Sequence, residues 1–533
     1  MFGSRSAVGA SGSRSSRKRA RKGAKRVKLS TLLGAFPQGR LLTGSADTEI
    51  AGVAYDSRKV RRGYLFVAIR GYRADGHAFI PQAIANGAAA VVVDEEHADL
   101  VVPSGVALVS APDGRRALSR LAAAFYHFPA RKMRTIGITG TNGKTTVAYL
   151  LSAILEAAGY RTGVLSSIEI KVGDVTRTNE TRRTTQESLD TQALLAEMAQ
   201  AGVEYAIIES TSHGLALQRV ADCDFDVAVF TNLTRDHFDF HQSREQYLAD
   251  KAILFESLAE AADKGLPKTS VLNADDETIR VLRDVSPARV IAYGIDNAAE
   301  VMAKDLVFAG PSPTFRLHAL GREASLGLAV PGRHNVHNAL AAAGAALALG
   351  VDFDVVVGAL ARFPGLRGRL QPIDCGQSFA VYVDYAHTPD GLRKVLETAR
   401  LQAAPRHVVL VFGAAGGRDK EKRPLMGSLG VELSDFCIVT NEDPVEEDPA
   451  AIIAQIEAGI VAAGGVRDQS YAVVLDRREA IRIALERARP GDVVLITGKG
   501  HERSMSVGTS EVPWDEVEVV REVLREVLQR RTA

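Results

Sequence analysis

The sequence contains little of what marks a secreted or a metal-cluster protein. It has three cysteines in 533 residues, Cys223, Cys375 and Cys437. Their wide spacing matches neither a disulfide framework nor a metal-binding motif. We therefore expect a cytoplasmic protein in a reducing compartment.

Long hydrophobic runs are also lacking. The most apolar window, Ala341–Leu360, is interrupted by Asp352 and Asp354, which predicts a core helix, a loop and a second helix rather than a membrane span. A hydrophobic content of 46% is ordinary for a soluble globular protein, and the length favours about three domains.

Neither sign of charge dominates the chain as a whole, since the formal net charge is +1, but the charges are distributed unevenly along it. Residues 1–28 carry ten Lys and Arg residues and no acid, which leaves the rest of the chain with an excess of nine acidic groups. We expect residues 1–28 to be a disordered basic tail. Binding of nucleic acid or an anionic membrane is the alternative for this tail, and no nucleic-acid partner is expected for the folded part.

The most informative stretch runs from Ile136 to Thr146 and reads IGITGTNGKTT. A β-branched run predicts a buried strand, and apolar residues at helical spacing from Val147 to Ala158 predict an amphipathic helix. Strand, glycine loop, Lys-Thr and helix is the layout of a phosphate cradle, in which Lys144 supplies a charge and the Thr145 hydroxyl can hold Mg²⁺.

The strict P-loop consensus fails because Ile138 occupies the position of its first glycine. An ordinary strand-to-helix turn is the alternative. Nucleoside triphosphate binding is the interpretation that the Gly140-to-Thr146 loop favours.

Three regions follow the basic tail. Strand-like runs at 63–68 and 88–93 and a helical pattern at 115–125 predict a small α/β domain over 29–129. The region 130–364 alternates strands (205–209, 227–231) with helices (189–201, 339–349) and predicts a mainly parallel, P-loop ATPase-like sheet. A hinge at Phe363–Arg369 leads to a Rossmann-like domain, 365–533, with strands at 380–384, 407–412, 436–440, 472–475 and 493–497.

Polar residues gather where strands of the central region end. Glu209 and His237 each follow such a strand, so with Thr145 they are candidates for an Mg²⁺ site beside a triphosphate. No Ser-His-Asp or Cys-His arrangement has nucleophile-elbow spacing, and Gly413–Arg418 does not match G-x-G-x-x-G, so hydrolase and nicotinamide chemistry are unsupported.

Several motifs together resemble the Mur ligase family, in particular the members that add the third amino acid of the peptidoglycan stem peptide. The resemblance covers nearly the whole chain from about residue 29. It is carried by segments 56–58 (DSR), 71–76 (GYRADG), 140–146 (GTNGKTT), 231–237 (TNLTRDH), 384–389 (DYAHTP), 417–420 (GRDK) and 498–502 (GKGHE).

The resemblance implies an ATP- and Mg²⁺-dependent ligase. In that family the D-glutamate carboxylate of UDP-MurNAc-L-Ala-D-Glu is phosphorylated to an acyl phosphate, which the amine of a diamino acid then attacks. Small molecules would be the partners of a monomer, and a carbamylated lysine of the family corresponds to Lys251. The implied catalytic residues are Lys144, Glu209, His237 and Lys251. The implied metal ligands are Thr145, Glu209, His237 and the Lys251 carbamate.

The resemblance also implies three binding sites. ATP would contact Gly140, Thr141, Asn142, Gly143, Lys144, Thr145, Thr146, Asn338, Arg369 and Asp384. The UDP-muramoyl dipeptide would contact Ser57, Tyr72, Arg73, Ala74, Thr184, Thr185, Thr211 and Arg219. The amino acid would contact Arg418, Glu442, Asp443, Val445, Gly498 and Glu502. One departure is Leu217, which stands where the family has a glutamine.

The segment 442–445 predicts the choice of amino acid. Family members that use meso-diaminopimelate typically have Asp-Asn-Pro-Arg, whereas this chain has Glu-Asp-Pro-Val. Valine cannot pair with a distal carboxylate, and an unpaired charge in a pocket costs a few kcal/mol. Acids crowd this loop, so a cationic side chain, L-lysine or L-ornithine, fits better. A solvated turn is the alternative explanation of those acids.

The sequence leaves two other functions open. The first is another amide ligase of the superfamily, which adds the terminal dipeptide or glutamate to folate; segments 56–58 and 498–502 argue against it. The second is a non-catalytic nucleotide-binding switch, which would need neither Lys251 nor the Glu209/His237 pair.

Overall fold

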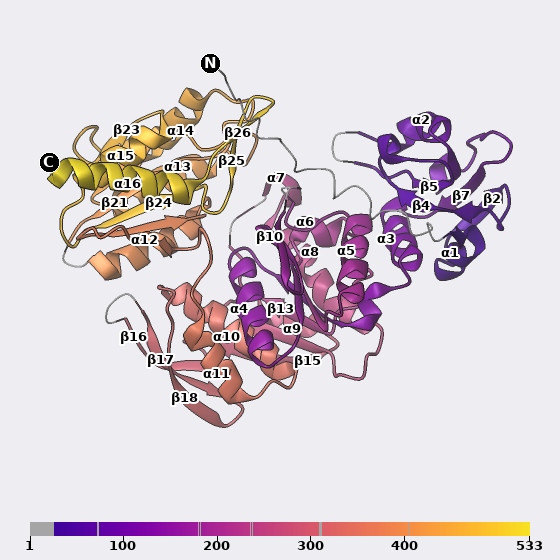
Figure 1. The fold of residues 1–533 in the computed structure, drawn as a ribbon, viewed down its shortest axis with the longest axis horizontal. Helices are drawn as coiled ribbons and strands as arrows, with labels where there is room; N and C mark the ends of the chain where they lie inside the picture. The colour runs from indigo at the N-terminus through magenta and orange to yellow at the C-terminus, as the bar shows by residue number, and fades with distance from the viewer. Residues whose placement is uncertain are drawn as a thin grey trace, which may run out of the picture. The chain divides into compact units, whose positions relative to one another are not determined.

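The computed structural model describes residues 26–71, 74–179, 181, 183–234, 236, 238–308, 312–403 and 406–532. The chain divides into two compact units, Met1–His127 and Phe128–Ala533. Figure 1 shows the course of the chain through both units. Among the described residues, no helix has the length and apolar character needed to cross a membrane.

The first unit is a small α/β domain. Its five-stranded sheet has the order β2-β7-β6-β5-β4 and is parallel except for the β2–β7 pair. Its main elements are α1 (Leu29–Ala35), β2 (Arg40–Thr43), β4 (Gly52–Ala54), β5 (Tyr64–Val67), α2 (Ile80–Ala85), β6 (Ala88–Asp94), β7 (Ala107–Ala111) and α3 (Gly114–Phe125). The predicted strands and helix of this region lie within one or two residues of β5, β6 and α3.

The second unit contains two large sheets, of which the first has eleven strands. Its strands are β8 (Arg134–Thr139), β9 (Thr162–Leu165), β10 (Glu169–Val172), β11 (Val175–Thr178), β12 (Tyr205–Glu209), β13 (Val227–Phe230), β14 (Thr269–Asn273), β15 (Arg289–Gly294), β16 (Val301–Val307), β17 (Thr314–Ala319) and β18 (Arg322–Gly327). The order is β11-β10-β9-β12-β8-β13-β14-β15-β16-β17-β18, and the strands from β9 to β16 in that order run parallel. The prediction of a mainly parallel sheet is confirmed.

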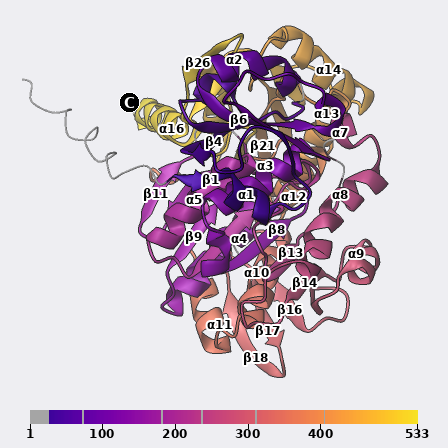
Figure 2. The same cartoon turned by 90° about the vertical axis from the view of Figure 1, so that its right-hand side faces the viewer.

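Helices cover both faces of this sheet. They are α4 (Lys144–Ala157), α5 (Ser188–Gln200), α6 (Ser212–Ala216), α7 (Phe238–His241), α8 (Arg244–Glu256), α9 (Ile279–Val285), α10 (Arg333–Ala348) and α11 (Phe353–Arg362). Because side chains alternate along a strand, Ile207 packs in the core under α4 and α10, while Ile208 packs under α5 and α8. Helices α4 and α10 lie side by side (Figures 1 and 2).

One predicted boundary is wrong. The helix predicted at 339–349 begins six residues earlier, because α10 runs from Arg333 to Ala348 and includes the polar segment 334–338. Its polar residues are accommodated inside the helix: the Asn335 amide donates to the Pro331 carbonyl at 2.8 Å, and the Asn338 amide donates to Asn335 Oδ1 at 3.0 Å. Buried amides that satisfy one another do not interrupt a helix.

The second sheet has the order β19-β20-β24-β21-β22-β23, and all its pairs are parallel except β19–β20. The elements of this region are β19 (Gln371–Pro372), β20 (Ala380–Asp384), α12 (Pro389–Ala403), β21 (Val408–Phe412), α13 (Lys422–Leu433), β22 (Phe436–Val439), α14 (Pro449–Ala462), β23 (Tyr471–Val473), α15 (Arg477–Arg487), β24 (Val493–Thr497), β25 (Ser504–Val507), β26 (Ser510–Pro513) and α16 (Glu516–Thr532). Leu410 packs with α12 to α14, and Val411 packs with α15 and α16, so this sheet is also covered on both faces.

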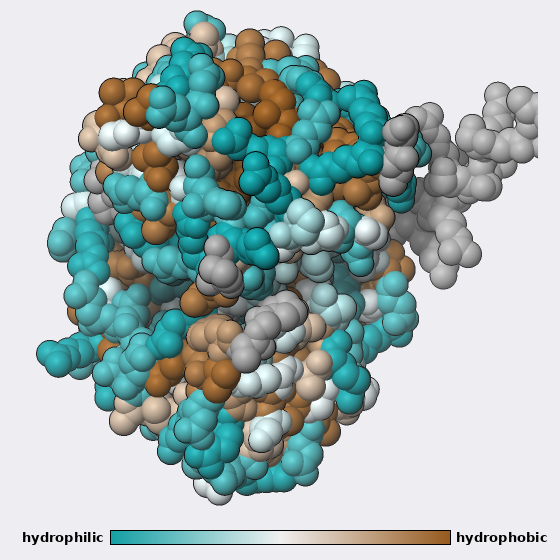
Figure 3. Space-filling view, turned by 90° about the vertical axis from the view of Figure 1, so that its left-hand side faces the viewer, coloured by the Kyte–Doolittle hydropathy of each residue, from teal (hydrophilic) through white to brown (hydrophobic). Residues whose placement is uncertain are grey.

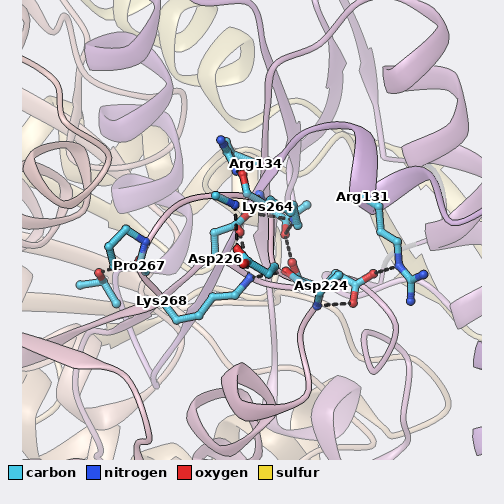
Figure 4. A network of polar contacts seen from close by, with 12 residues as sticks. Arg131, Arg134, Asp224, Asp226, Lys264, Pro267 and Lys268 are labelled. Carbon is cyan, nitrogen blue, oxygen red and sulfur yellow. Dashed lines mark hydrogen bonds and ion pairs between the residues drawn. The ribbon is translucent and has the colours of Figure 1, made fainter.

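A buried network of polar contacts fastens the amino ends of β8, β13 and β14 (Figure 4). Asp226 is fully buried; it accepts hydrogen bonds from the Thr135 backbone at 2.9 Å, Lys264 Nζ at 2.8 Å and Lys268 Nζ at 3.0 Å. Burial lowers the pKa of Lys264. The network lies at the end of the sheet opposite to the phosphate loop, so its role is structural.

Figure 3 shows one face of the molecule, on which hydrophilic residues cover much of the surface and hydrophobic residues lie between them. An exposed apolar residue is ordinary for a globular protein, and this face alone does not indicate a partner.

Candidate active site

The loop between β8 and α4 depends on two glycines. Gly140 has φ +140°, and an added Cβ would lie 1.9 Å from Thr231 Oγ1. Gly143 has φ +91°, and an added Cβ would lie 2.3 Å from Asn338 Oδ1. A side chain at either position would have a strained backbone conformation and would displace a neighbouring polar side chain, so glycine is strongly favoured at both.

The segment after β13 holds this loop in shape. Thr141 N donates to the Asn232 carbonyl at 2.8 Å, and Asn142 N donates to Asn232 Oδ1 at 3.1 Å. Thr231 Oγ1 donates to the Asn142 carbonyl at 2.6 Å. A loop held by external hydrogen bonds keeps its geometry without a bound anion, which lowers the cost of binding one.

Lys144, Thr145 and Glu209 lie together at the start of α4. Lys144 Nζ donates to the carbonyls of Gly140 at 3.0 Å and Thr141 at 2.9 Å. Glu209 is buried at the end of β12. Burial lowers the pKa of Lys144 and raises that of Glu209, and the attraction between the two groups opposes both shifts.

Lys251 approaches the same loop from α8. Its side chain is buried, its Nζ donates to the Gly140 carbonyl at 3.0 Å, and its Nζ lies 4.2 Å from the centre of the Tyr247 ring. Burial, and then the neighbouring Lys144 charge, hold the pKa of Lys251 well below its ordinary range. An ordinary surface lysine would show neither this burial nor this shift. His237, the other predicted metal ligand, lies outside the described residues.

The predicted dipeptide-binding residues of this unit lie next to Glu209. Thr185 Oγ1 donates to the Glu209 carbonyl at 2.8 Å and lies 3.0 Å from Thr211 Oγ1. Arg219 donates to the Thr185 carbonyl at 3.3 Å. The half-buried Thr184 directly precedes Thr185. These side chains therefore form one polar wall beside the phosphate loop.

A cavity of about 520 Å³ opens beside the loop. The predicted ATP-binding residues that line it are Asn142, Gly143, Thr146, Asn338, Arg369 and Asp384. The Arg369 guanidinium lies over the Tyr385 ring, 4.7 Å from its centre. Asp384 accepts from the backbone N–H groups of Leu370 and Ala386 at 2.6 and 2.7 Å, and burial raises its pKa. A cavity of this size matches a nucleotide-sized ligand.

The predicted amino-acid residues form a second cluster, at the carboxyl ends of β22 and β24. Lys499 is buried and forms ion pairs with Asp443, at 2.8 Å, and with Glu502. An added Cβ on Gly498 would lie 2.6 Å from Glu442 Oε2. Burial raises the pKa of Glu442 to about 7, despite the nearby lysines and arginine. Among the described residues, Glu442 Oε2 has no hydrogen-bond partner.

Several acids of the 442–448 loop have structural partners. Asp443 pairs with Lys499, Glu447 pairs with Arg423 at 2.9 Å, and Asp448 caps α14 by accepting from Ala450 N at 3.1 Å. The loop therefore carries less unpaired negative charge than its sequence indicates, and its acids offer less attraction to a cationic substrate.

Val445 and Arg418 complete the predicted set. Val445 has φ +54°, a strained conformation for a β-branched residue, and its backbone bonds to Ser506 O and Gly508 N hold it there. Arg418 is exposed on the loop after β21, and the adjacent Gly417 N donates to Glu447 at 2.6 Å.

In the first unit, two of the residues predicted to contact the UDP-muramoyl dipeptide are described. Ser57 is buried, and its Oγ donates to Gln82 Oε1 at 2.9 Å. The Ala74 carbonyl accepts from Gly71 N at 2.9 Å. Tyr72 and Arg73 lie outside the described residues.

Sequence reasoning missed three groups at the site. Asn232 holds the phosphate loop, and Asp390 accepts a hydrogen bond from the Asn142 side chain at 2.7 Å. His241 joins Ser212 to Asp250. Asn232 belongs to the segment 231–237, whose place after a strand of the parallel sheet is visible in the sequence, but its role in holding the loop is not. The other two depend on contacts that no local pattern indicates.

A buried lysine and carboxylate at a glycine loop, beside a cavity of nucleotide size, are typical of α/β enzymes that use a nucleoside triphosphate. Three family models match the chain: the Mur ligase family catalytic domain over 49–126, the Mur ligase middle domain over 138–346, and the Mur ligase glutamate ligase domain over 368–500.

Curated relatives match over nearly their whole length. UDP-N-acetylmuramyl-tripeptide synthetase of Roseiflexus sp. (strain RS-1) is 47% identical, over 90% of this chain and 95% of the relative. UDP-N-acetylmuramoyl-L-alanyl-D-glutamate–2,6-diaminopimelate ligase of Caldanaerobacter subterraneus subsp. tengcongensis is 44% identical, over 91% and 97%. A solved structure of a ligase with that second name has a TM-score of 0.65 at 29% identity, covering 94% of this chain and 99% of that one.

The chain belongs to the Mur ligase family. It is therefore an ATP-dependent ligase that forms peptide bonds in peptidoglycan synthesis.

Proposed function

We propose that this ligase adds the third amino acid to UDP-MurNAc-L-Ala-D-Glu through an acyl phosphate on the D-glutamate side chain. The observation that carries the proposal is the convergence of Lys144, Glu209 and Lys251 on one loop, beside the wall formed by Thr185 and Thr211. The names of the two most similar relatives described above agree with this substrate.

In the first step a carboxylate must attack the terminal phosphate of ATP, so two anions approach each other. Lys144 lies at the loop that would hold the phosphates, and Arg219 lies at the polar wall that would hold the dipeptide. Fixed positive charges of this kind lower the barrier because they are already oriented before the charges meet. The acyl phosphate then loses phosphate when the amine of the third amino acid attacks its carbonyl carbon.

The residues around Thr145 fit Mg²⁺. Thr145 Oγ1 lies 3.2 Å from Ser167 Oγ, and Glu209 accepts from Ser167 N at 3.2 Å, so a hydroxyl and a buried carboxylate offer oxygen atoms at one place. Mg²⁺ prefers such ligands and keeps several waters. Thr145 and Glu209 would hold it, with His237 proposed as a further ligand, and its charge would offset that of the phosphates.

We propose that Lys251 is carbamylated. Carbamylation needs an uncharged amine, which attacks CO₂ and releases a proton, and the lowered pKa of Lys251 favours that uncharged form. The carbamate is an anion with two oxygens, so it can hold a cation where an ammonium cannot.

Each of three successive regions of the chain has its own proposed role. We propose that residues 29–129 bind the uridine part, that 130–364 bind ATP and carry out the reaction, and that 365–533 bind the amino acid. We propose that the protein is cytoplasmic and works as a monomer. Sedimentation of the purified protein tests its monomeric state.

For the third amino acid we propose L-lysine or L-ornithine rather than meso-diaminopimelate. Most acids of this loop have partners within the protein, so the proposal does not rest on their charge. It rests on Val445, which offers no positive charge to a distal carboxylate. This preference differs from the printed names of several relatives, which are diaminopimelate ligases.

Phosphate release from ATP, Mg²⁺ and UDP-MurNAc-L-Ala-D-Glu tests both parts. We expect release that requires an added amino acid and is faster with lysine or ornithine. A clear preference for diaminopimelate would contradict the role of Val445, and no release with any amino acid would contradict the proposed reaction.

A further inference from the structure

Three buried side chains from three helices form a continuous hydrogen-bonded chain. His241 Nδ1 lies 2.6 Å from Asp250 Oδ2, and His241 Nε2 lies 2.9 Å from Ser212 Oγ. Ser212 and His241 are 1% exposed and Asp250 is 8% exposed. The three residues belong to α6, α7 and α8, and we call them the Ser212–His241–Asp250 chain.

The partners of His241 satisfy both of its ring nitrogens. A carboxylate only accepts, so His241 Nδ1 donates to Asp250. The Ser212 hydroxyl can donate or accept, so it satisfies His241 Nε2 in either protonation state of the ring. The second oxygen of Asp250 accepts from Gln246 Nε2 at 2.9 Å, so this carboxylate is held at both oxygens.

Each end of the chain adjoins a predicted functional residue. Asp250 directly precedes Lys251, whose Nζ contacts the phosphate loop. Ser212 directly follows Thr211, which caps α6 by accepting from Gly214 N at 3.1 Å and contacts Thr185. The chain therefore joins the helix that carries Lys251 to the wall that would bind the D-glutamate end of the substrate.

The same three residue types form the nucleophilic triad of many hydrolases. A nucleophilic serine needs an accessible oxygen beside an oxyanion site. Ser212 is almost fully buried, so no acyl group can reach its oxygen. The arrangement is suited to holding elements together.

We infer that His241 is a positioning residue of the ligase reaction. It fixes α6, which Thr211 caps, relative to α8, which carries Lys251. The inference rests on the proposed function. If the two helices shift, the carboxylate to be phosphorylated and the groups at the phosphate loop lose their alignment, and small misplacements reduce rates strongly.

Steady-state kinetics and calorimetric binding of the full-length protein test this role. His241→Phe keeps a ring beside Phe240 and Tyr247 but removes both hydrogen bonds. We expect kcat to fall at least ~10-fold and the affinity for UDP-MurNAc-L-Ala-D-Glu to weaken by a similar factor, while the affinity for a non-hydrolysable ATP analogue stays within about twofold. Ser212→Ala, a smaller change, should alter the same constants in the same direction. His318→Phe, in the β17 strand, is the matched control and should change none of them.

A double-mutant cycle then tests whether His241 transmits the effect. Ser212→Ala and Asp250→Asn act through the same histidine, so their combined loss should be clearly smaller than the product of the single losses. Losses that multiply, or unchanged kcat and dipeptide affinity in His241→Phe, would overturn the inference. Failure of the proposed function is distinguishable, since the parent protein would then neither release phosphate with the dipeptide nor bind it.

Discussion

The side chain of Asn142, in the phosphate loop, donates a 2.7 Å hydrogen bond to Asp390 Oδ2 next to the start of α12. The same oxygen accepts from Lys394 Nζ at 2.7 Å. Asn142 and Lys394 both line the 520 Å³ cavity. The carboxylate thus connects the nucleotide loop directly to the part of the chain proposed to bind the amino acid.

Removal of this carboxylate is expected to weaken the use of ATP. Asp390→Ala leaves the Asn142 amide and the Lys394 ammonium without their shared acceptor, and a hydrogen bond to a charged group contributes about 1.5–3 kcal/mol. We expect KM for ATP to rise about 10-fold or more. Asp390→Asn keeps an acceptor for Asn142 and should retain more activity; equal losses in both variants would show that the Asn142 contact is unimportant.

Gly143 permits a direct test of the phosphate loop with a matched control. Gly143→Ala places a methyl group 2.3 Å from Asn338 Oδ1 at φ +91°, so we expect loss of measurable binding of an ATP analogue in calorimetry. Gly159 has nearly the same φ, +89°, but nothing within 4 Å. Gly159→Ala should lose stability through backbone strain alone and still bind the nucleotide. Equal binding by both variants would contradict the proposed location of the phosphates.

Lys251→Ala tests the carbamate. We expect activity to fall on the order of 100-fold, and partial recovery when acetate or another short carboxylate is added. Lys304→Ala, at an exposed position on β16, is the control and should be fully active. Full activity of Lys251→Ala without any added carboxylate, equal to that of Lys304→Ala, would show that no anion is needed at this position.

Glu442 predicts a dependence of stability on pH. Its pKa is about 7 in the folded protein against an ordinary value of 4.5, so the folded state retains its proton where the unfolded chain has released it. The contribution of Glu442 to the free energy of unfolding is therefore most favourable below about pH 4.5, and this contribution is lost as the pH rises to about 7. Glu442→Gln should therefore gain stability over the parent between those pH values, by up to about 3 kcal/mol in chemical unfolding. A difference that is constant with pH would contradict this.

Asp226 should matter for stability and not for catalysis. Asp226→Asn leaves the buried Lys264 and the nearby Lys268 without their shared negative charge. Removing one partner of a buried ion pair typically costs about 3–5 kcal/mol, so we expect a lower midpoint of unfolding. At a temperature where the variant is folded, KM for ATP should match that of the parent. A parent-like midpoint would show that the network in Figure 4 contributes little.

The sequence predicts the parts of this site that local rules determine. The glycine loop is visible because two glycines and Lys144 stand between a strand and a helix, and Glu209 is visible because parallel strands end at the same edge of a sheet. Residues joined by long-range contacts are not visible in this way: Asp390 lies 248 positions from Asn142. The acids at 442–448 show the same limit, since a sequence gives their charges but not partners such as Lys499.

The most direct test of the central claim follows the oxygen atoms of the D-glutamate carboxylate. UDP-MurNAc-L-Ala-D-Glu labelled with ¹⁸O in that carboxylate is incubated with ATP, Mg²⁺ and the amino acid that supports the fastest phosphate release, and the phosphate is analysed by mass spectrometry. An acyl phosphate transfers one labelled oxygen to phosphate when the amine displaces it, so we predict one ¹⁸O atom in each phosphate released. Phosphate without the label would contradict phosphorylation of this carboxylate.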